Sequence, residues 1–227
     1  MTEILVNSEP IISYDPARAG IDISAVLVTE KQTITQINDF DAPISFDKFR
    51  VLASYDLKGM DYLIQIIELG KIVTKVRQAF RKDPVIVVDV GGNEGLADAL
   101  RGGLPGVTLC KFVGDMDKEI SYHRGFRILN KPVWVTKLSI LLEQDRIDID
   151  ADLSSAKEIK KQLESFQAEY RKSGSVGYNA GRDAHDDYIS CLMLSISDRR
   201  RAFAVEMPPA IVHNAPSVKG AYRYGGY

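Results

Sequence analysis

Two aspartates of this 227-residue chain directly follow predicted strands. Asp15 ends an apolar run, and Pro16 after it stops a strand because proline cannot donate to a sheet ladder. Asp89 ends a β-branched run, which is typical of a strand buried on both faces. Open sheets bind ligands at the carboxyl ends of their strands. If the two strands are neighbours, both carboxylates therefore lie at one edge of the sheet.

An acidic pair, Asp186 and Asp187, opens a predicted helix that would pack across this edge. Several carboxylates in one place repel one another strongly unless cations are present. Hard divalent ions accept oxygen ligands, and Mg²⁺ typically keeps several waters and bridges to phosphate. Two such ions can stabilise the attacking and leaving oxygens of phosphodiester cleavage. We therefore predict a two-metal site formed by Asp15, Asp89 and one or both members of the pair.

Each of these residues also has an ordinary structural interpretation. An aspartate after a strand is often a turn residue, and an acidic pair suits a helix N-terminus. The glycines after Asp89 could instead form a phosphate-cradling turn. His185 is an accessory candidate that could bind metal or transfer a proton, although a capping role explains it as well. Glu94, one turn beyond Asp89, is either an extra ligand or a solvent-exposed residue. The joint placement of the four aspartates favours a shared metal site.

Five basic residues are candidates for contacting a DNA backbone. The formal net charge is -2, so any DNA contact needs a local basic patch. Phosphate contacts need only arginine or lysine, and an ordinary solvated surface is the alternative interpretation. The candidates are Arg18, Arg124, Arg127, Lys131 and Arg182.

Length and composition are sufficient for one well-packed domain, since 45% of the residues are hydrophobic. The two cysteines lack metal-ligand spacing and favour a reduced, intracellular setting. The sequence contains no secretory signal and no apolar run long enough to cross a membrane. We assign residues 1–207 to the domain and residues 208–227, which are rich in glycine and tyrosine, to an extended or disordered tail.

Hydrophobic periodicity predicts an antiparallel meander followed by alternating helices and strands. The order predicts an α/β fold of the ribonuclease H type: a mixed five-stranded sheet flanked by helices, with extra helical and loop elaborations. Residues 39–59 are expected to be a connecting segment, and residues 173–182 a flexible or hairpin-like loop. The predicted strands are 11–14, 23–29, 31–37, 85–88, 107–113 and a short one at 147–149. The predicted helices are 61–80, 94–100, 133–142, 154–170 and 186–199.

Three segments resemble motifs of a known family. Residues 14–25, 85–92 and 184–192 are similar to the first, second and terminal acidic motifs of the nuclease domain in the large terminase subunits of tailed bacteriophages. Residues 126–149 resemble the middle region of that domain. The resemblance covers about residues 11–200, and the three motifs in order are more specific than any one of them.

This resemblance implies a nuclease that cuts concatemeric viral DNA during genome packaging with Mg²⁺ or Mn²⁺. The implied partners are double-stranded DNA, the terminase ATPase domain, the small terminase subunit and the portal protein, in the host cytoplasm and without a membrane. The family's ATPase motor is missing, because no G-x-x-x-x-G-K-[ST] loop occurs here. The linker-like start favours a domain excised from a longer chain over a separately encoded nuclease.

One departure concerns the last motif. Related resolvase-like sites often carry a further acidic residue one helical turn after the first, and Ser190 stands at that position here. The acidic ligand must then come from the pair. We favour Asp187, so the expected catalytic residues are Asp15, Asp89 and Asp187, with Asp186 as an additional metal ligand.

Other functions remain open at this stage. A Holliday-junction resolvase on the same fold would use the same chemistry on a different substrate. A non-enzymatic DNA-binding assembly module would keep the fold with a degenerate site. A nucleotide binder of the actin or sugar-kinase type is disfavoured, because the chain is short for two such lobes.

Overall fold

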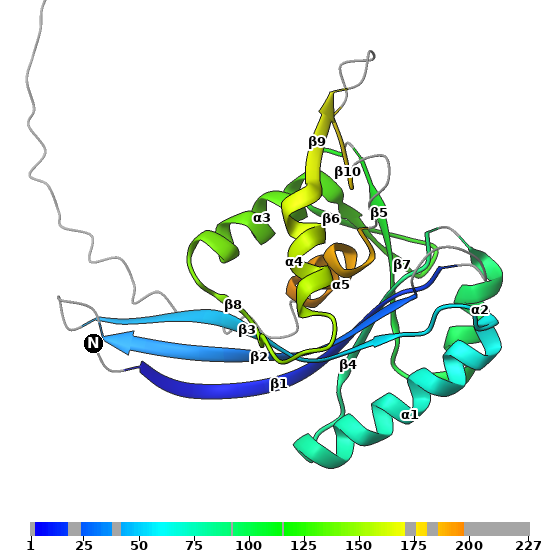
Figure 1. Cartoon of the computed structure of the whole chain (residues 1–227), viewed down its shortest axis with the longest axis horizontal. Helices are drawn as coiled ribbons and strands as arrows, with labels where there is room; N and C mark the ends of the chain where they lie inside the picture. Colours follow the sequence, from blue (N-terminus) through cyan, green and yellow to red (C-terminus); the bar gives the residue numbers. More distant parts are fainter. Residues whose placement is uncertain are drawn as a thin grey trace, which may run out of the picture.

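The computed structural model describes residues 3–17, 24–37, 42–91, 93–114, 116–170, 176–180 and 186–197, and it shows an α/β architecture (Figure 1). Its main sheet has the strand order β6-β7-β5-β4-β1-β2-β3-β8. The eight strands are β1 (Glu3–Asp15), β2 (Ala25–Ile37), β3 (Pro43–Asp56), β4 (Val85–Asp89), β5 (Thr108–Val113), β6 (Ile120–His123), β7 (Phe126–Asn130) and β8 (Ile147–Ile149).

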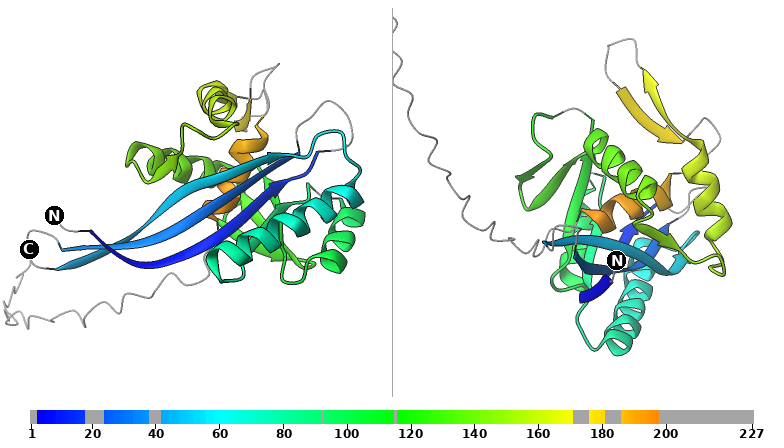
Figure 2. Two further views of the ribbon diagram at one scale, coloured as in Figure 1. Left: turned by 60° about the horizontal axis from the view of Figure 1, so that its bottom comes forward. Right: turned by 90° about the vertical axis from the view of Figure 1, so that its left-hand side faces the viewer.

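Helices cover both faces of this sheet. One face carries α1 (Tyr62–Phe80) and α2 (Glu94–Gly103), and α3 (Lys131–Glu143), α4 (Ala156–Ser165) and α5 (Asp187–Ile196) lie on the other face (Figure 2). A separate hairpin, β9 (Phe166–Tyr170) with β10 (Val176–Ala180), projects from the α4 side (Figure 1). No helix in the described part of the chain is long and apolar enough to cross a membrane.

Strand pairing brings the two predicted acidic strands together. β1 and β4 are parallel neighbours, with Ile11 opposite Val85 and Tyr14 opposite Val88. β1, β2 and β3 form an antiparallel meander, and β4, β5 and β7 continue the sheet in parallel. Because both β1 and β4 end in an aspartate, the carboxylates of these neighbouring strands lie at the same edge.

Alternation along the central strands creates two hydrophobic cores. Ile11 of β1 and Val87 of β4 face the layer of α3, α4 and α5. Ile12 and Val88 face α1 and α2. Successive side chains of a strand point to opposite faces, so a strand covered on both sides is apolar at most positions. Full burial of one such side chain contributes about 1.5–3 kcal/mol.

Two predictions about the meander are wrong. Residues 31–37 do not form a hairpin partner, because β2 runs unbroken from Ala25 to Ile37. Glu30, which lies between the two predicted strands, stays within the ladder opposite Pro10 of β1 and Arg50 of β3, and its carboxylate accepts a hydrogen bond from the Ser8 hydroxyl. The third strand comes instead from the segment expected to be a connection. Pro43 is the first residue of β3, a position where proline is tolerated.

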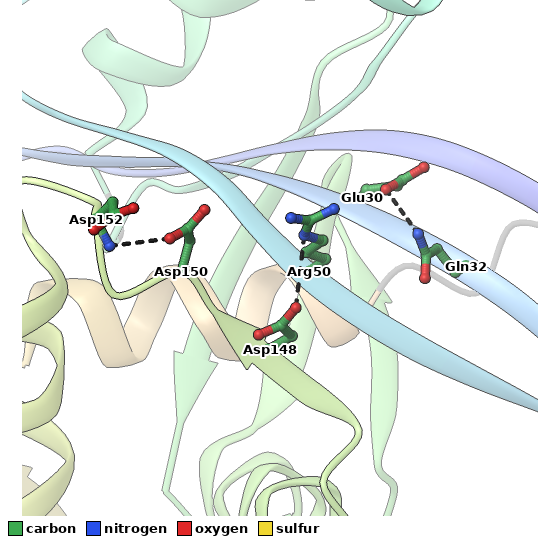
Figure 3. A network of polar contacts seen from close by, with 6 residues as sticks. All are labelled: Glu30, Gln32, Arg50, Asp148, Asp150 and Asp152. Carbon is green, nitrogen blue, oxygen red and sulfur yellow. Dashed lines mark hydrogen bonds and ion pairs between the residues drawn. The ribbon is translucent and has the colours of Figure 1, made fainter.

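The sheet is consequently larger than the five strands predicted. The polar segment around residues 115–131 contributes β6 and β7, a hairpin at the sheet edge that lacks a long apolar run. The short strand at 147–149 is confirmed as β8 at the opposite edge. There Arg50 of β3 forms an ion pair with Asp148 of β8, with 3.6 Å between nitrogen and oxygen (Figure 3).

The segment after residue 154 also differs from its prediction. The helix ends at Ser165, and residues 166–170 form β9 because they pair with β10, which lies within the predicted loop. Tertiary pairing here overrides helix propensity. Ser155 occupies the N-cap position of α4, but its hydroxyl donates to the Ser54 hydroxyl at 2.5 Å and makes no capping bond.

Candidate functional site

A cavity of about 810 Å³ opens at the carboxyl ends of β1 and β4. The three aspartates predicted to be catalytic all line it, although they come from two strands and a helix far apart in the sequence. The lining residues are Asp15, Pro16, Ala17, Tyr62, Asp89, Val90, Gly91, Asn93, Glu94, Leu96 and Asp187.

Asp15 is the last residue of β1 and is held from the α5 side. The side chain of Ser190 forms a hydrogen bond with the Asp15 carboxylate. Burial raises the pKa of Asp15 well above its ordinary value, and the negative charges of Asp89 and Asp187 raise this pKa further. The Ser190 hydrogen bond opposes the increase. Asp15 therefore lies in a concentrated negative environment, as predicted for a cluster of carboxylates.

Asp89 combines a turn role with its place in the cavity. Its Oδ1 accepts a hydrogen bond from the Gly91 amide at 2.9 Å, and Gly91 adopts a left-handed φ of 53° that suits glycine. Burial raises the pKa of Asp89 to about 6, and the Gly91 hydrogen bond and the positive charges of Lys131 and Lys111 oppose this rise. The turn interpretation is therefore confirmed for Asp89, and the same residue lines the cavity.

The acidic pair at the start of α5 is divided between two environments. Asp187 is the first residue of the helix and lines the cavity. Asp186 occupies the N-cap position and forms an ion pair with Lys131, with 3.0 Å between Oδ2 and Nζ. A carboxylate bound to lysine is less available to an ion than one that faces the cavity. This placement supports the choice of Asp187 over Asp186.

The donor set fits a hard divalent cation. All three cavity aspartates supply oxygen atoms, and their mutual repulsion would be relieved by a cation. Within the described part of the chain, no three histidine, cysteine, aspartate or glutamate side chains lie close enough to hold one ion by themselves. Mg²⁺ is usually bound through only one or two carboxylates, with water and substrate phosphate completing its coordination. The arrangement suits that mode better than a closed protein cage.

The remaining predicted site residues are more scattered. Glu94 is exposed and lies on the cavity wall. Arg124 is exposed in the turn between β6 and β7. Arg127 donates to the Ser197 carbonyl oxygen at 3.3 Å, and Lys131 is occupied by Asp186. The other three, Arg18, Arg182 and His185, lie outside the described residues.

Four contributors were not identified from the sequence. Tyr62 and Asn93 line the cavity, and Asn93 also caps α2 by accepting from the Leu96 amide at 3.0 Å. The positive charge of Lys111 lowers the pKa of Asp89, and the Ser190 side chain contacts Asp15. An asparagine before a helix is a recognisable capping signal. The other three depend on contacts between distant segments, for which the sequence gives no local signal.

Solved structures share this fold. The large terminase nuclease from thermophilic phage G20c with bound magnesium aligns with a TM-score of 0.55 at 15% identity, over 87% of this chain and 88% of that chain. The large terminase nuclease domain of Thermus phage P74-26 aligns with a TM-score of 0.55 at 16% identity, over 87% and 85%. The G20c nuclease with bound cobalt gives 0.53 at 14% identity, over 87% and 88%. The sequence itself matches no protein-family profile and no curated protein.

At this level of sequence identity, the comparisons establish the fold of the chain. The chain has the ribonuclease-H-like fold of large-terminase nuclease domains, with a mixed sheet between two helical layers. The predicted fold class is therefore confirmed, and the resemblance carried by the three acidic motifs is confirmed at the level of the fold.

Proposed function

We propose that this chain is a divalent-metal-dependent endodeoxyribonuclease that cuts concatemeric viral DNA during genome packaging. The observation that carries the proposal is the convergence of Asp15, Asp89 and Asp187 on one cavity. They meet at the carboxyl ends of two central strands, in a fold shared with large-terminase nucleases. One of those nucleases was solved with magnesium and again with cobalt.

In this proposal Asp15, Asp89 and Asp187 hold two Mg²⁺ or Mn²⁺ ions, and Asp186 is a secondary ligand. Bound ions would supply Lewis-acid stabilisation of the attacking and leaving oxygens of the phosphodiester. The cavity is the right kind of environment for such ions, because burial and like charge disfavour three ionised carboxylates without them.

The protein's own residues prepare this site for its substrate. The Gly91 amide fixes one oxygen of Asp89, and the Ser190 side chain holds Asp15. Lys131 neutralises Asp186, which limits the negative charge that an approaching phosphate must meet. Arg124 is the best exposed of the described DNA-binding candidates, because Arg127 and Lys131 have partners within the chain.

The biological setting belongs to the same proposal. The substrate is double-stranded DNA, and the partners are the terminase ATPase domain, the small terminase subunit and the portal protein, within the host cytoplasm. Residues 1–207 are assigned to the nuclease domain, and residues 208–227, expected to be an extended or disordered tail, lie outside the described residues. His185 and Glu94 are accessory candidates, and Arg18 and Arg182 complete the set of residues proposed to contact DNA.

The direct test is cleavage of supercoiled plasmid in Mn²⁺ or Mg²⁺ by the wild type and by Asp15→Ala. Loss of Asp15 is expected to reduce the rate by more than about 100-fold, since even the outer partners of metal ligands often cost 10- to 100-fold. Asp148→Ala is the control, because Asp148 lies on β8 at the far side of the sheet. Cleavage by Asp15→Ala at the wild-type rate would remove Asp15 from the mechanism.

Substrate choice separates packaging from recombination. Linear duplex and four-way junctions should be compared under the same metal conditions. The packaging proposal predicts efficient cleavage of ordinary duplex. Strong preference for the junction would replace it with a resolvase function, and DNA binding without cleavage or metal uptake would indicate an assembly module.

A further inference from the structure

Helix α5 carries an unusual row of small polar side chains on a buried face. Every residue from Tyr188 to Ile196 is buried, between the sheet on one side and α3 and α4 on the other (Figure 1). Polar groups in such a place are costly unless they form hydrogen bonds. The hydroxyl of Ser195 donates to the Ser13 hydroxyl at 3.0 Å, and the Cys191 thiol lies 3.2 Å from the Ala25 carbonyl oxygen.

The first member of this row, Ser190, contacts a cavity aspartate. Its side chain is only 5% exposed and forms a hydrogen bond with Asp15. Ala25, which Cys191 contacts, is the β2 residue paired with Asp15 across the ladder. The helical turn at residues 190–191 therefore lies directly over the end of β1.

The same turn connects Ser190 to the other side of the cavity. Ser190 follows Asp187 by three residues, so the two side chains lie on one face of the helix. The Ser190 amide donates to the Asp186 carbonyl oxygen at 2.8 Å, which fixes this turn. One turn of α5 thus places the Asp187 carboxylate at the cavity and the Ser190 hydroxyl next to the Asp15 carboxylate of β1.

A hydrogen bond from the hydroxyl to one carboxylate oxygen restricts rotation of the Asp15 side chain. A carboxylate has a second oxygen that can accept, and Asp15 lines the cavity. An oriented ligand loses less conformational entropy when an ion binds than a freely rotating one does. Groups that orient metal ligands in this way typically change metal affinity by about 10- to 100-fold.

We propose that Ser190 is a positioning residue that fixes the Asp15 carboxylate relative to Asp187, so that both can serve one divalent-ion site. The inference rests on the proposed function, because it assigns Ser190 a role in the metal site of that function. A neutral hydroxyl at this place orients a carboxylate without adding a further negative charge to the cluster.

The test is Mn²⁺ titration calorimetry on the full chain. Ser190→Ala is expected to weaken Mn²⁺ binding by about tenfold. Ser190→Thr keeps the hydroxyl and should restore affinity close to the wild type. Ser195→Ala is the matched control, because it removes an equally buried hydroxyl from the same helix, away from the cavity aspartates. This control should alter the urea midpoint but leave Mn²⁺ affinity unchanged.

The possible results distinguish failure of the Ser190 inference from failure of the proposed metal site. Equal affinities for the wild type and Ser190→Ala overturn the inference, as does an equal loss of affinity in Ser195→Ala. If Ser190→Ala does not fold, Ser190→Cys carries the same test, because a thiol is a weak donor of similar size. A wild type that binds no Mn²⁺ refutes the proposed metal site itself and the inference with it. Wild-type binding with no effect at Ser190 refutes the inference alone.

Discussion

Helices α1 and α5 pack on opposite faces of β1 but present different surfaces. α1 is an outer helix: it buries one side, and Leu63, Ile64 and Ile67 remain exposed. α5 is an inner helix, buried along almost its whole length. Because α5 is enclosed on all sides, its first residue, Asp187, has little freedom where it lines the cavity.

The same contrast appears at two successive residues of β1. Tyr14 points toward the α1 layer, where Gln65 of α1 accepts the hydrogen bond from its hydroxyl. Asp15 contacts Ser190 of α5. On the α1 side a neutral phenol is buried and satisfied, and burial raises its pKa well above the ordinary value. On the α5 side a charged group is left open to a cavity. One face therefore stabilises the strand end, and the other face carries the proposed chemistry.

The largest expected effect distinguishes the two acids of α5. Asp187→Asn should reduce plasmid cleavage by about 1000-fold, because loss of one group that stabilises transition-state charge costs about 100- to 1000-fold. Asp186→Asn removes a partly exposed ion pair with Lys131 and should cost less than about tenfold. Single-turnover rates in Mn²⁺ measure both variants. A greater loss from Asp186→Asn would reverse the assignment within the pair.

The next largest effect is on the free energy of unfolding, where substitutions in α5 and α1 are compared. Leu192→Ala in α5 removes a side chain that is 1% exposed and should lower the free energy of unfolding by about 3 kcal/mol. Ile67→Ala in α1, where the side chain is 59% exposed, should change it by less than about 0.5 kcal/mol. Urea denaturation monitored by circular dichroism gives both values. Similar losses would show that α1 is covered in solution by something that buries Ile67.

A smaller effect tests the hydrogen bond beneath α1. Gln65→Leu leaves the buried Tyr14 hydroxyl without its acceptor and should cost about 1–3 kcal/mol of stability. Mn²⁺ affinity should stay near the wild-type value, in contrast to Ser190→Ala. Adding Tyr14→Phe should recover much of the loss, since removing both partners is less costly than removing one. A double variant as unstable as Gln65→Leu alone would mean that the other Gln65 contacts, to Met60 and Ala17, dominate.

The smallest expected effect is a gain in the stability of the metal-free chain when Asp89 is replaced. Its pKa is raised from 3.8 to about 6 in the folded state, so the folded chain binds this proton more tightly than the unfolded chain does. The free energy of unfolding of the metal-free chain should therefore fall as pH rises from about 4 through 6. Asp89→Asn should weaken this dependence, to which Asp15 also contributes, and stabilise the metal-free chain at pH 7.5 by about 1–2 kcal/mol.

Thermal melts at pH 4 and pH 7.5 measure this difference, with Asp148→Asn as the control. The gain should be absent at pH 4, where Asp89 is protonated in the folded wild type. Added Mn²⁺ should stabilise the wild type at pH 7.5 more than the variant. An Asp89→Asn chain that is less stable than the wild type at pH 7.5 would show that the Gly91 hydrogen bond outweighs the charge burial.

Parts of the fold could be predicted because their patterns are local. The β-branched run before Asp89 and the apolar run before Asp15 identify central strands, and both strands occur where expected. The prediction for β2 was wrong because Glu30 interrupts its apolar pattern while staying paired with Pro10 and Arg50 in the ladder. β9 was missed because its pairing with β10, and not its local propensity, makes it a strand.

The sequence alone determined where the aspartates stand, at two strand ends and at a helix start, and it predicted metal-ion chemistry from them. It left open which aspartates meet. Tertiary structure decided that β1 and β4 are parallel neighbours, that Asp187 lines the cavity, and that Lys131 engages Asp186. It also brought Ser190 to Asp15, across about 175 residues of chain, a separation over which only packing creates a contact. Residue types are encoded one by one, but a site that binds ions depends on distances between elements that only the folded chain establishes.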